Sequence, residues 1–281
     1  MSYLFSIAMG FLQGVAEFLP ISSSGHLTLF QYFFSPEQNP EELDMLFTIL
    51  LHFGTLISVC VYYWRDVVDM IREFFLGLAD LFSRRGGHTG RPPEARRLVL
   101  MIVVATLPLF AVLLVKDVVD AAFTNVTFVS AALIATGFLL FFSDRMAKGR
   151  KNARTATMLD ALLVGVGQAI ATVPGISRSG MTICAGCFRG FERKFAVRFA
   201  FLLSIPAVLG ANILEISDVI AAGGIDTALL PTYAVGVLTA AVSGYLSIAL
   251  VRLVANKGKF GAFAYYCWAA GAVTLVLTAL Q

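Results

Sequence analysis

The chain has 281 residues, of which 58% are hydrophobic and 14% are charged, and its mean hydropathy is +0.81. A composition this apolar excludes an ordinary soluble domain and predicts a protein whose solvent is the lipid bilayer. The formal net charge of +3 is too small to predict a nucleic-acid partner. No Lys or Arg precedes the first apolar run, which argues against a cleaved signal peptide.

Six stretches are apolar and long enough to cross a bilayer, which takes about 20 residues each. They are residues 45–64, 98–115, 126–143, 195–214, 230–251 and 262–280. Two further apolar stretches, 2–34 and 157–188, are each interrupted in the middle by a Pro and a Ser/Gly-rich turn. Between the first two spans, apolar residues from Val67 to Phe82 recur at helical spacing and predict an amphipathic helix on the membrane surface.

The two interrupted stretches are copies of each other. The sequence GFLQGVAEFLPISSSGHL, from Gly10, is echoed about 155 residues later by GVGQAIATVPGISRSGMT, from Gly165. A fixed internal period constrains architecture more strongly than any single motif does. The chain is therefore expected to contain two structural repeats within a single integral membrane domain, residues 1–281.

Basic residues predict how the chain crosses the membrane. Nineteen of the 21 Lys and Arg residues fall in the segments 65–97, 144–156, 189–198 and 252–259, which the positive-inside rule makes cytoplasmic. The acidic loops 35–44 and 215–229 and the nearly neutral loop 116–125 are expected outside. Because 157–188 has cytoplasmic segments at both ends, it must enter the membrane and return, and by analogy 2–34 does so from outside.

The predicted fold is an all-α polytopic membrane protein with six transmembrane helices and two re-entrant helical hairpins in an inverted repeat. Each repeat holds one hairpin and three crossings, and an odd number of crossings inverts the second copy. Repeat one covers 1–143, with hairpin 2–34 and helices 45–64, 98–115 and 126–143. Repeat two covers 157–280, with hairpin 157–188 and helices 195–214, 230–251 and 262–280.

Each repeat carries one charged residue deep in its hairpin, Glu17 in the first and Arg178 in the second. A charge at the bilayer centre costs about 2.5–3.5 kcal/mol on insertion scales, which favours a functional role. The alternative is a buried ion pair that only locks the repeats together, although such pairs rarely add net stability.

The Ser/Gly-rich turns each open a new helix, where free backbone N–H groups and the positive dipole end favour an anion. Candidate binding residues are Ser22, Ser24, Gly25, Ser177, Ser179 and Gly180, with Thr182 on the same helix face as Arg178. The alternative for a single Ser-rich break is N-capping of the helix. Two such breaks around one Arg favour phosphate, because guanidinium is suited to bidentate phosphate contacts.

Acid–base and metal chemistry have candidates in the first hairpin. His26 is close in sequence to Ser23 and Glu17, so nucleophilic or acid–base work is plausible there, against a packing role for a lone His. Gln13 and Glu17, four residues apart, share a helix face and are candidate ligands for Mg²⁺ or Ca²⁺. His52 is a second intramembrane His, for which packing and function are equally open. The pair Cys184 and Cys187 is expected to pack rather than to bind metal.

These motifs resemble the bacterial undecaprenyl-pyrophosphate phosphatase family, the bacitracin-resistance proteins. The first family motif is matched by Gln13, Glu17 and the run Phe18–Leu19–Pro20 through Ser22–His26, with Gln13 in place of a possible second carboxylate. The second motif is matched from Pro174 to Thr182, and His52–Thr55 is also similar to the family. The resemblance covers essentially the whole chain.

The resemblance implies hydrolysis of undecaprenyl pyrophosphate to undecaprenyl phosphate and phosphate, which recycles the lipid carrier of cell-wall polymers. It implies a bacterial cytoplasmic (inner) membrane location, with the site opening to the periplasmic side. Arg178 would bind phosphates, Glu17 and Gln13 would support metal or pyrophosphate, and Ser23 or His26 would attack. Our hypothesis is Ser23 as nucleophile with His26 as base. A flippase of a phosphorylated polyprenyl lipid and a structural scaffold are the alternatives, and a homodimer is left open.

Overall fold

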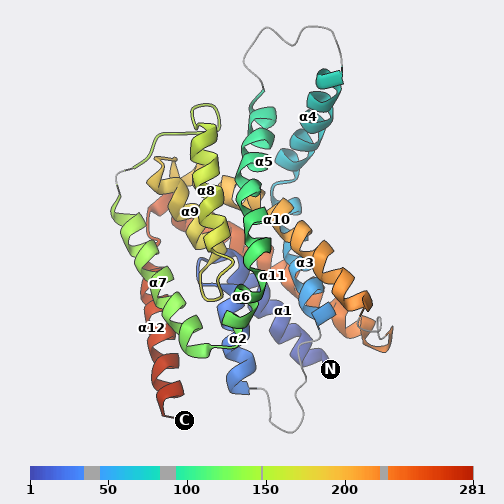
Figure 1. Cartoon of the computed structure of the whole chain (residues 1–281), viewed down its shortest axis with the longest axis vertical. Coiled ribbons are helices and arrows are strands. Elements are labelled where there is room, and N and C mark those ends of the chain that lie inside the picture. The colour runs from blue at the N-terminus through green and yellow to red at the C-terminus, as the bar shows by residue number, and fades with distance from the viewer. Residues whose placement is uncertain (35–44, 83–92, 147, 222–226, 281) are drawn as a thin grey trace.

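The computed structural model describes residues 1–34, 45–82, 93–146, 148–221 and 227–280, which are mainly helical (Figure 1). The α-helices in chain order are α1 (Tyr3–Phe18), α2 (Ser23–Phe34), α3 (Met45–Tyr62), α4 (Trp64–Phe82), α5 (Glu94–Val112), α6 (Lys116–Phe123), α7 (Val126–Arg145), α8 (Met158–Ile170), α9 (Arg178–Phe188), α10 (Arg193–Ala221), α11 (Leu230–Lys257) and α12 (Gly261–Ala279). Two 3₁₀ turns, η1 (Leu113–Val115) and η2 (Thr227–Leu229), precede α6 and α11. In these ranges the strand-like pairing is limited to one bridge between Lys151 and Phe191, so the predicted all-α class is confirmed.

Several helices have the length and composition of membrane spans. Within the described ranges five pass that test, and a sixth is added if the bent pair α3 and α4 counts as one span. α1 and α8 are apolar but have only 16 and 13 residues. At 1.5 Å per residue they are about 20–24 Å long, shorter than the hydrocarbon core of about 30 Å. Neither would cross a bilayer alone.

Helices extend beyond the apolar stretches that predicted them. α10 covers Arg193–Ala221 where 195–214 was predicted, and α11 covers Leu230–Lys257 where 230–251 was predicted. Hydropathy detects the part of a helix suited to lipid, whereas Lys, Arg and Asn can continue the same helix at its polar ends.

The loop predicted at 116–125 was wrong, because most of it forms α6. The pattern of Lys116, Asp117 and Asp120 among Val and Ala residues is that of a short amphipathic helix, which a search for long apolar runs overlooks.

The predicted amphipathic helix is present as α4, which bends by 89° from α3. Val67 packs against the core, while Ile71 and Phe75 are exposed. Arg96 of α5 ties α4 down by donating to Glu73 at 2.9 Å and Asp80 at 2.7 Å. Its place on a membrane surface stays a prediction. The predicted outside loop 35–44 and residues 83–92 of the basic segment 65–97 lie outside the described residues.

Both predicted breaks occur at the expected prolines. α1 ends at Phe18, before Pro20, and α8 ends at Ile170, before Pro174. Proline has no backbone N–H and its ring clashes with the preceding turn, which disfavours a continuing helix. Proline alone is not decisive, because α5 and α10 continue past Pro108 and Pro206, and at the two breaks a Ser/Gly-rich turn follows the proline. In each hairpin the backbone then reverses direction through a residue with positive φ, which is +72° at Ser22 before α2 and +89° at Gly175 before α9.

The first helix of each hairpin packs on a long helix from the other half of the chain. α1 lies along α11, and α8 lies along α5. Glycines allow these close approaches, since a Cβ at Gly10 would collide with the Gly236 carbonyl and one at Gly165 with the Ala105 carbonyl. α7 and α12 also run side by side, and α3 packs against both α10 and α11 (Figure 1).

Ion pairs join three of the four basic segments at one end of the molecule. Asp160 accepts from Lys151 at 2.8 Å and from Arg189 at 2.9 Å, and Arg198 reaches both Asp66 and Glu94. The segments therefore share one polar end, as the positive-inside argument requires of cytoplasmic loops. Cys184 and Cys187 are free and buried in the hydrophobic core, in agreement with the predicted packing role.

Candidate active site

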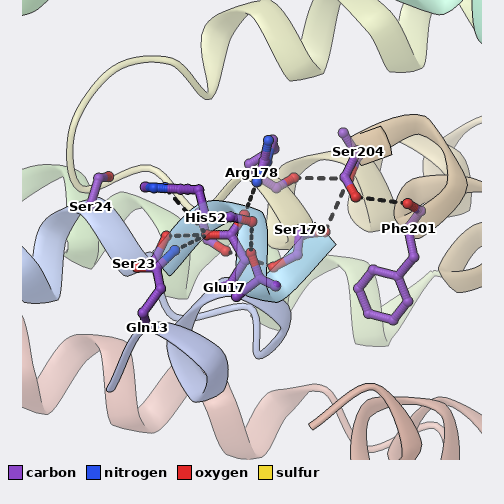
Figure 2. A network of polar contacts seen from close by, with 12 residues as sticks. Gln13, Glu17, Ser23, Ser24, His52, Arg178, Ser179, Phe201 and Ser204 are labelled. Carbon is purple, nitrogen blue, oxygen red and sulfur yellow. Dashed lines mark hydrogen bonds and ion pairs between the residues drawn. The ribbon is translucent and has the colours of Figure 1, made fainter. Parts of the chain in front are cut away.

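The two helix breaks meet at one cavity of about 600 Å³. Its walls combine polar side chains of the two hairpins and α3 with apolar side chains of α5, η1 and α10. The charged and polar lining includes Glu17, Ser23, Ser24, His52, Gln168, Thr172 and Arg178. Figure 2 shows that Glu17, Ser23, His52 and Arg178, which come from three separate parts of the chain, converge at its polar wall.

Glu17 is the hub of this cavity. One carboxylate oxygen accepts from the Ser23 hydroxyl at 2.7 Å and from the Gln13 amide at 3.1 Å, and the other pairs with the Arg178 guanidinium (Figure 2). The Glu17 side chain is only 4% exposed. A buried carboxylate needs a cationic partner and hydrogen-bond donors, and Arg178, Ser23 and Gln13 supply them here. Glu17 and Arg178, the charged residues that the sequence places one in each hairpin, are therefore in direct contact.

Ser23 is presented by a strained turn. It is the first residue of α2, directly after Ser22, whose φ of +72° is rare for a residue with a side chain. Such a conformation costs about 1–3 kcal/mol and persists where the surrounding structure enforces it. The turn directs the Ser23 hydroxyl at Glu17, and a carboxylate at 2.7 Å is a suitable acceptor for its proton.

Four predicted anion-binding residues instead form helix caps. The Ser22 hydroxyl accepts from the Gly25 N–H at 3.2 Å, and the Ser177 hydroxyl accepts from the Gly180 N–H at 3.1 Å. These two amides are therefore not open to an anion, and the N-capping alternative describes them correctly. The anion site expected from Ser22, Gly25, Ser177 and Gly180 is therefore not available, because these residues hydrogen-bond to each other.

The remaining predicted binding residues divide between the cavity and the core. Ser24 lines the cavity. Ser179 joins the two turns instead, because its hydroxyl donates to the Leu19 carbonyl at 3.3 Å. Thr182 was expected to face a phosphate, but it is buried and its hydroxyl donates to the Arg178 carbonyl at 2.8 Å. Thr182 therefore supports the backbone of Arg178, and Ser179 links the second turn to the first.

His26 does not meet Glu17. Its Nδ1 lies 2.7 Å from the Ser22 carbonyl, its Nε2 lies 2.7 Å from the Tyr266 hydroxyl, and the two rings stack. The hypothesis that His26 is the base for Ser23 is not supported, since both ring nitrogens have other partners. His26 instead links the Ser22 carbonyl of the strained turn to Tyr266 of α12. The direction of the helix that follows Ser22 determines where the His26 ring points, and this direction cannot be predicted from the spacing of residues along the chain.

His52 stands where His26 was expected. Its Nδ1 donates to the Thr48 carbonyl at 2.9 Å, so its Nε2 is the nitrogen that faces Glu17, at 4.0 Å. The sequence marked His52 as an intramembrane His, with packing equally open. Two signals pointed to function: the cost of placing an imidazole in an apolar helix, and the similarity of His52–Thr55 to the family.

The residues around Glu17 are a poor match for a divalent cation held by Glu17 and Gln13. Glu17 is surrounded by the guanidinium of Arg178 and by the N–H and O–H donors of Gln13 and Ser23. Mg²⁺ and Ca²⁺ need oxygen acceptors, and Gln13 turns its amide nitrogen toward the carboxylate. In the described part of the chain, no three His, Cys, Asp or Glu side chains cluster as metal ligands would.

Comparison with known proteins identifies the family. The family model described as bacitracin resistance protein BacA matches residues 6–273. The chain belongs to this BacA family. Among relatives named undecaprenyl-diphosphatase, those of Alkaliphilus metalliredigens and Methanosphaera stadtmanae are each 37% identical, over 98% of this chain and 98% of theirs. The relative from Halothermothrix orenii is 38% identical over 98% of this chain and 97% of its own.

The BacA family assignment confirms the resemblance drawn from the two motifs. Both motifs contribute to the cavity, the first through Glu17 and Ser23 and the second through Arg178. The two motifs are about 155 residues apart in sequence, but in the fold their turns line the same cavity.

Proposed function

We propose that this protein hydrolyses undecaprenyl diphosphate to undecaprenyl phosphate and inorganic phosphate. The observation that carries the proposal is a serine hydroxyl 2.7 Å from a buried carboxylate that is paired with an arginine, all at one cavity. A nucleophile, a proton acceptor and an anion-binding cation are the parts that phosphoryl transfer needs. The names of the relatives, undecaprenyl-diphosphatase, support the same reaction.

The first half of the reaction is transfer of the terminal phosphoryl group to Ser23. The Ser23 oxygen forms a bond to the terminal phosphorus while the bond to the bridging oxygen breaks, and undecaprenyl phosphate leaves. Glu17 accepts the hydroxyl proton, and Arg178 then exchanges its contact with Glu17 for contacts with phosphate oxygens. His52, with its Nε2 4.0 Å from Glu17, is the next group in line to take up that proton.

The second half is hydrolysis of the phosphoserine. A water molecule attacks the phosphorus and gives its proton to the Glu17–His52 pair, the bond to the Ser23 oxygen breaks, and inorganic phosphate leaves. The Ser23 oxygen takes one proton back from the Glu17–His52 pair, and the second proton leaves with the phosphate product or to bulk water, which restores the starting state. A pure transporter would need Arg178 but would have no use for a serine aimed at a carboxylate, so the flippase alternative has less support.

The apolar wall of the cavity suits the polyprenyl tail. Leu109, Phe110 and Leu113 line it from α5 and η1, and Ile213 and Leu214 line it from α10. Several of these side chains are also exposed on the surface of the molecule, as residues in contact with lipid would be. The tail can thus remain in lipid while the diphosphate reaches Arg178.

We further propose the membrane arrangement predicted from the sequence, with six spans and the hairpins α1–α2 and α8–α9 re-entering from opposite sides. The reciprocal packing of α1 on α11 and α8 on α5 supports an inverted repeat over 1–143 and 157–280. The ion-paired basic end supports a cytoplasmic side opposite the cavity, in the bacterial inner membrane. A homodimer stays a prediction.

Binding of Mg²⁺ or Ca²⁺ also stays a prediction. Glu17 and Gln13 by themselves do not form a site for such a cation, because their contacts are with donors and with each other. A cation would depend on the phosphate oxygens of the substrate, so it would bind together with the substrate rather than before it.

Phosphate release from undecaprenyl diphosphate by the protein purified in detergent tests the proposal, because no membrane gradient exists there. We expect Ser23→Ala to lose activity by about 10⁴-fold or more and His26→Ala to lose only about tenfold. Wild-type protein that releases no phosphate, or Ser23→Ala protein that releases it at the normal rate, would refute the assignment.

A further inference from the structure

The side chain of Gln168 is a buried amide with no protein partner. It lies on α8, two residues before the helix ends, and is only 1% exposed. Among the described residues neither its Nε2 nor its Oε1 finds a hydrogen bond. Buried amides are nearly always paired, because leaving both ends unpaired costs stability, so an exception indicates a missing partner.

The place of that missing partner is the active-site cavity. Gln168 lines the same cavity as Glu17, Ser23 and Arg178. Glu17, whose other oxygen lacks a hydrogen bond, also lines it but has Arg178 as its ionic partner, whereas Ser143 and Trp268 do not line it. Gln168 is therefore a buried, unpaired amide in the wall of the space that the substrate head would occupy.

The internal repeat gives a second, independent reason. Gln168 is the counterpart of Gln13, and the glycines three residues earlier, Gly165 and Gly10, make the equivalent close helix contacts. Gln13 already uses its Nε2 to bind Glu17. Its counterpart in the second hairpin has Thr172, not a carboxylate, four residues on, and the Thr172 hydroxyl donates to the Ala169 carbonyl. The Gln168 amide is thus left without the acceptor that Gln13 has.

We infer that Gln168 is a substrate-binding residue whose Nε2–H donates to an oxygen of the lipid diphosphate. The inference rests on the proposed function for the identity of the ligand. An anionic oxygen is the acceptor that the second hairpin lacks, and Arg178 next to the same cavity would hold the same diphosphate. A bound diphosphate would thus give the Gln168 Nε2–H the acceptor that it lacks.

The test is Gln168→Met, which keeps the shape of the side chain and removes its hydrogen bonding. We expect kcat/KM for undecaprenyl diphosphate to fall about tenfold to a hundredfold, as for loss of one hydrogen bond to a charged group. The melting temperature should stay equal or rise, because the variant removes an unpaired buried amide. A purely structural Gln168 predicts the opposite pair of results, a lower melting temperature and an unchanged kcat/KM.

Ser58→Ala is the matched control. Ser58 is equally buried, on a helix that also contributes to the cavity, but its hydroxyl donates to the Ala241 carbonyl at 2.7 Å. This variant should lower the melting temperature and leave kcat/KM unchanged. Comparison of the two variants therefore distinguishes a buried polar group that is paired within the protein from one whose partner is the substrate.

A binding measurement separates this inference from the proposed reaction. In Ser23→Ala protein, which cannot turn over by the proposed route, Gln168→Met should weaken binding of farnesyl diphosphate about tenfold or more and leave farnesol binding unchanged. Equal weakening of both, or of neither, would overturn the inference. If the wild type released no phosphate, the proposed function would fail while this measurement still decided the role of Gln168.

Discussion

The turn between α1 and α2 and the turn between α8 and α9 share a sequence pattern but present different chemistry to one cavity. At equivalent places the first turn has Glu17 and Ser23 where the second has Thr172 and Arg178, and all four residues line the cavity. The capping residues are instead alike, since Ser22 and Ser177 both accept an N–H three residues on, at 3.2 Å and 3.1 Å.

The comparison separates two kinds of position. Those that build the turn keep their residues, because both helices need the same cap. Those that face the cavity differ, because two identical charged turns placed face to face would repel each other in a medium of low dielectric constant. With a carboxylate on one side and a guanidinium on the other, the two charges satisfy each other until a substrate takes the cation.

Among the variants that compare the two turns, the largest effect is expected from removing the charge of the first turn. Glu17→Gln keeps the shape of the side chain but cannot accept the Ser23 proton, so kcat should fall by about 10³–10⁴-fold. The matched control is Thr172→Val in the second turn, whose hydroxyl already donates to the Ala169 carbonyl. It should change kcat by less than about threefold. Equal losses in the two variants would mean that the turns do not differ in role.

The next largest effect is expected at the cation of the second turn. Arg178→Lys keeps the charge but loses the planar pair of donors, so kcat/KM should fall by about 10²–10³-fold. Arg189→Lys changes the same residue type at the polar end, against Asp160 and away from the cavity, and should leave kcat/KM unchanged. A fully active Arg178→Lys protein would show that a point charge is sufficient.

A third prediction concerns the start of the second hairpin. Burial alone would raise the pKa of the Asp160 carboxyl, but hydrogen bonds from Lys151, Thr157 and Arg189 outweigh it and hold this pKa well below its usual range. Asp160→Asn should therefore destabilise the protein by about 2–4 kcal/mol near neutral pH. Exposed Asp69→Asn on α4 should change stability by less than about 0.5 kcal/mol.

The pH dependence of the Asp160 effect has a definite sign. Because the folded-state pKa is lowered, the stabilisation is fully present above the unfolded pKa of about 3.9 and is lost as the pH falls toward the folded value. The difference in melting temperature between wild type and Asp160→Asn should be constant from neutral pH to about pH 5 and shrink below that. A difference that grew in acid would contradict the ion-pair account.

The smallest effect is expected behind the first turn. His26→Ala removes the side chain that holds the Ser22 carbonyl and Tyr266, and we expect kcat to fall by about tenfold through poorer placement of Ser23. His52→Ala should cost more, since His52 lines the cavity. If His26→Ala were the more damaging variant, His26 would have a direct part in proton transfer that its position in this structure does not suggest.

The sequence predicted the helical class, the two breaks, the approximate apolar helices and one charged residue within each hairpin. These follow from local chemistry and from the repeat, because a proline followed by a Ser/Gly-rich turn disfavours a continuous helix, and a charge within an apolar segment is costly enough to indicate a role. Serine and glycine at the start of a helix were less informative, because the same residues suit an anion cradle and a cap.

The roles of His26, His52 and Gln168 were decided only by the tertiary structure. His26 is three residues from Ser23 in sequence, but the helix that begins at Ser23 turns it toward Tyr266 of α12, 240 residues away. His52 and Gln168 reach the cavity through the packing of α3 and α8 against helices distant in the chain. Local sequence determines which groups are present and where helices end, whereas the direction in which a side chain points depends on helix phase and on contacts that no short stretch of sequence contains.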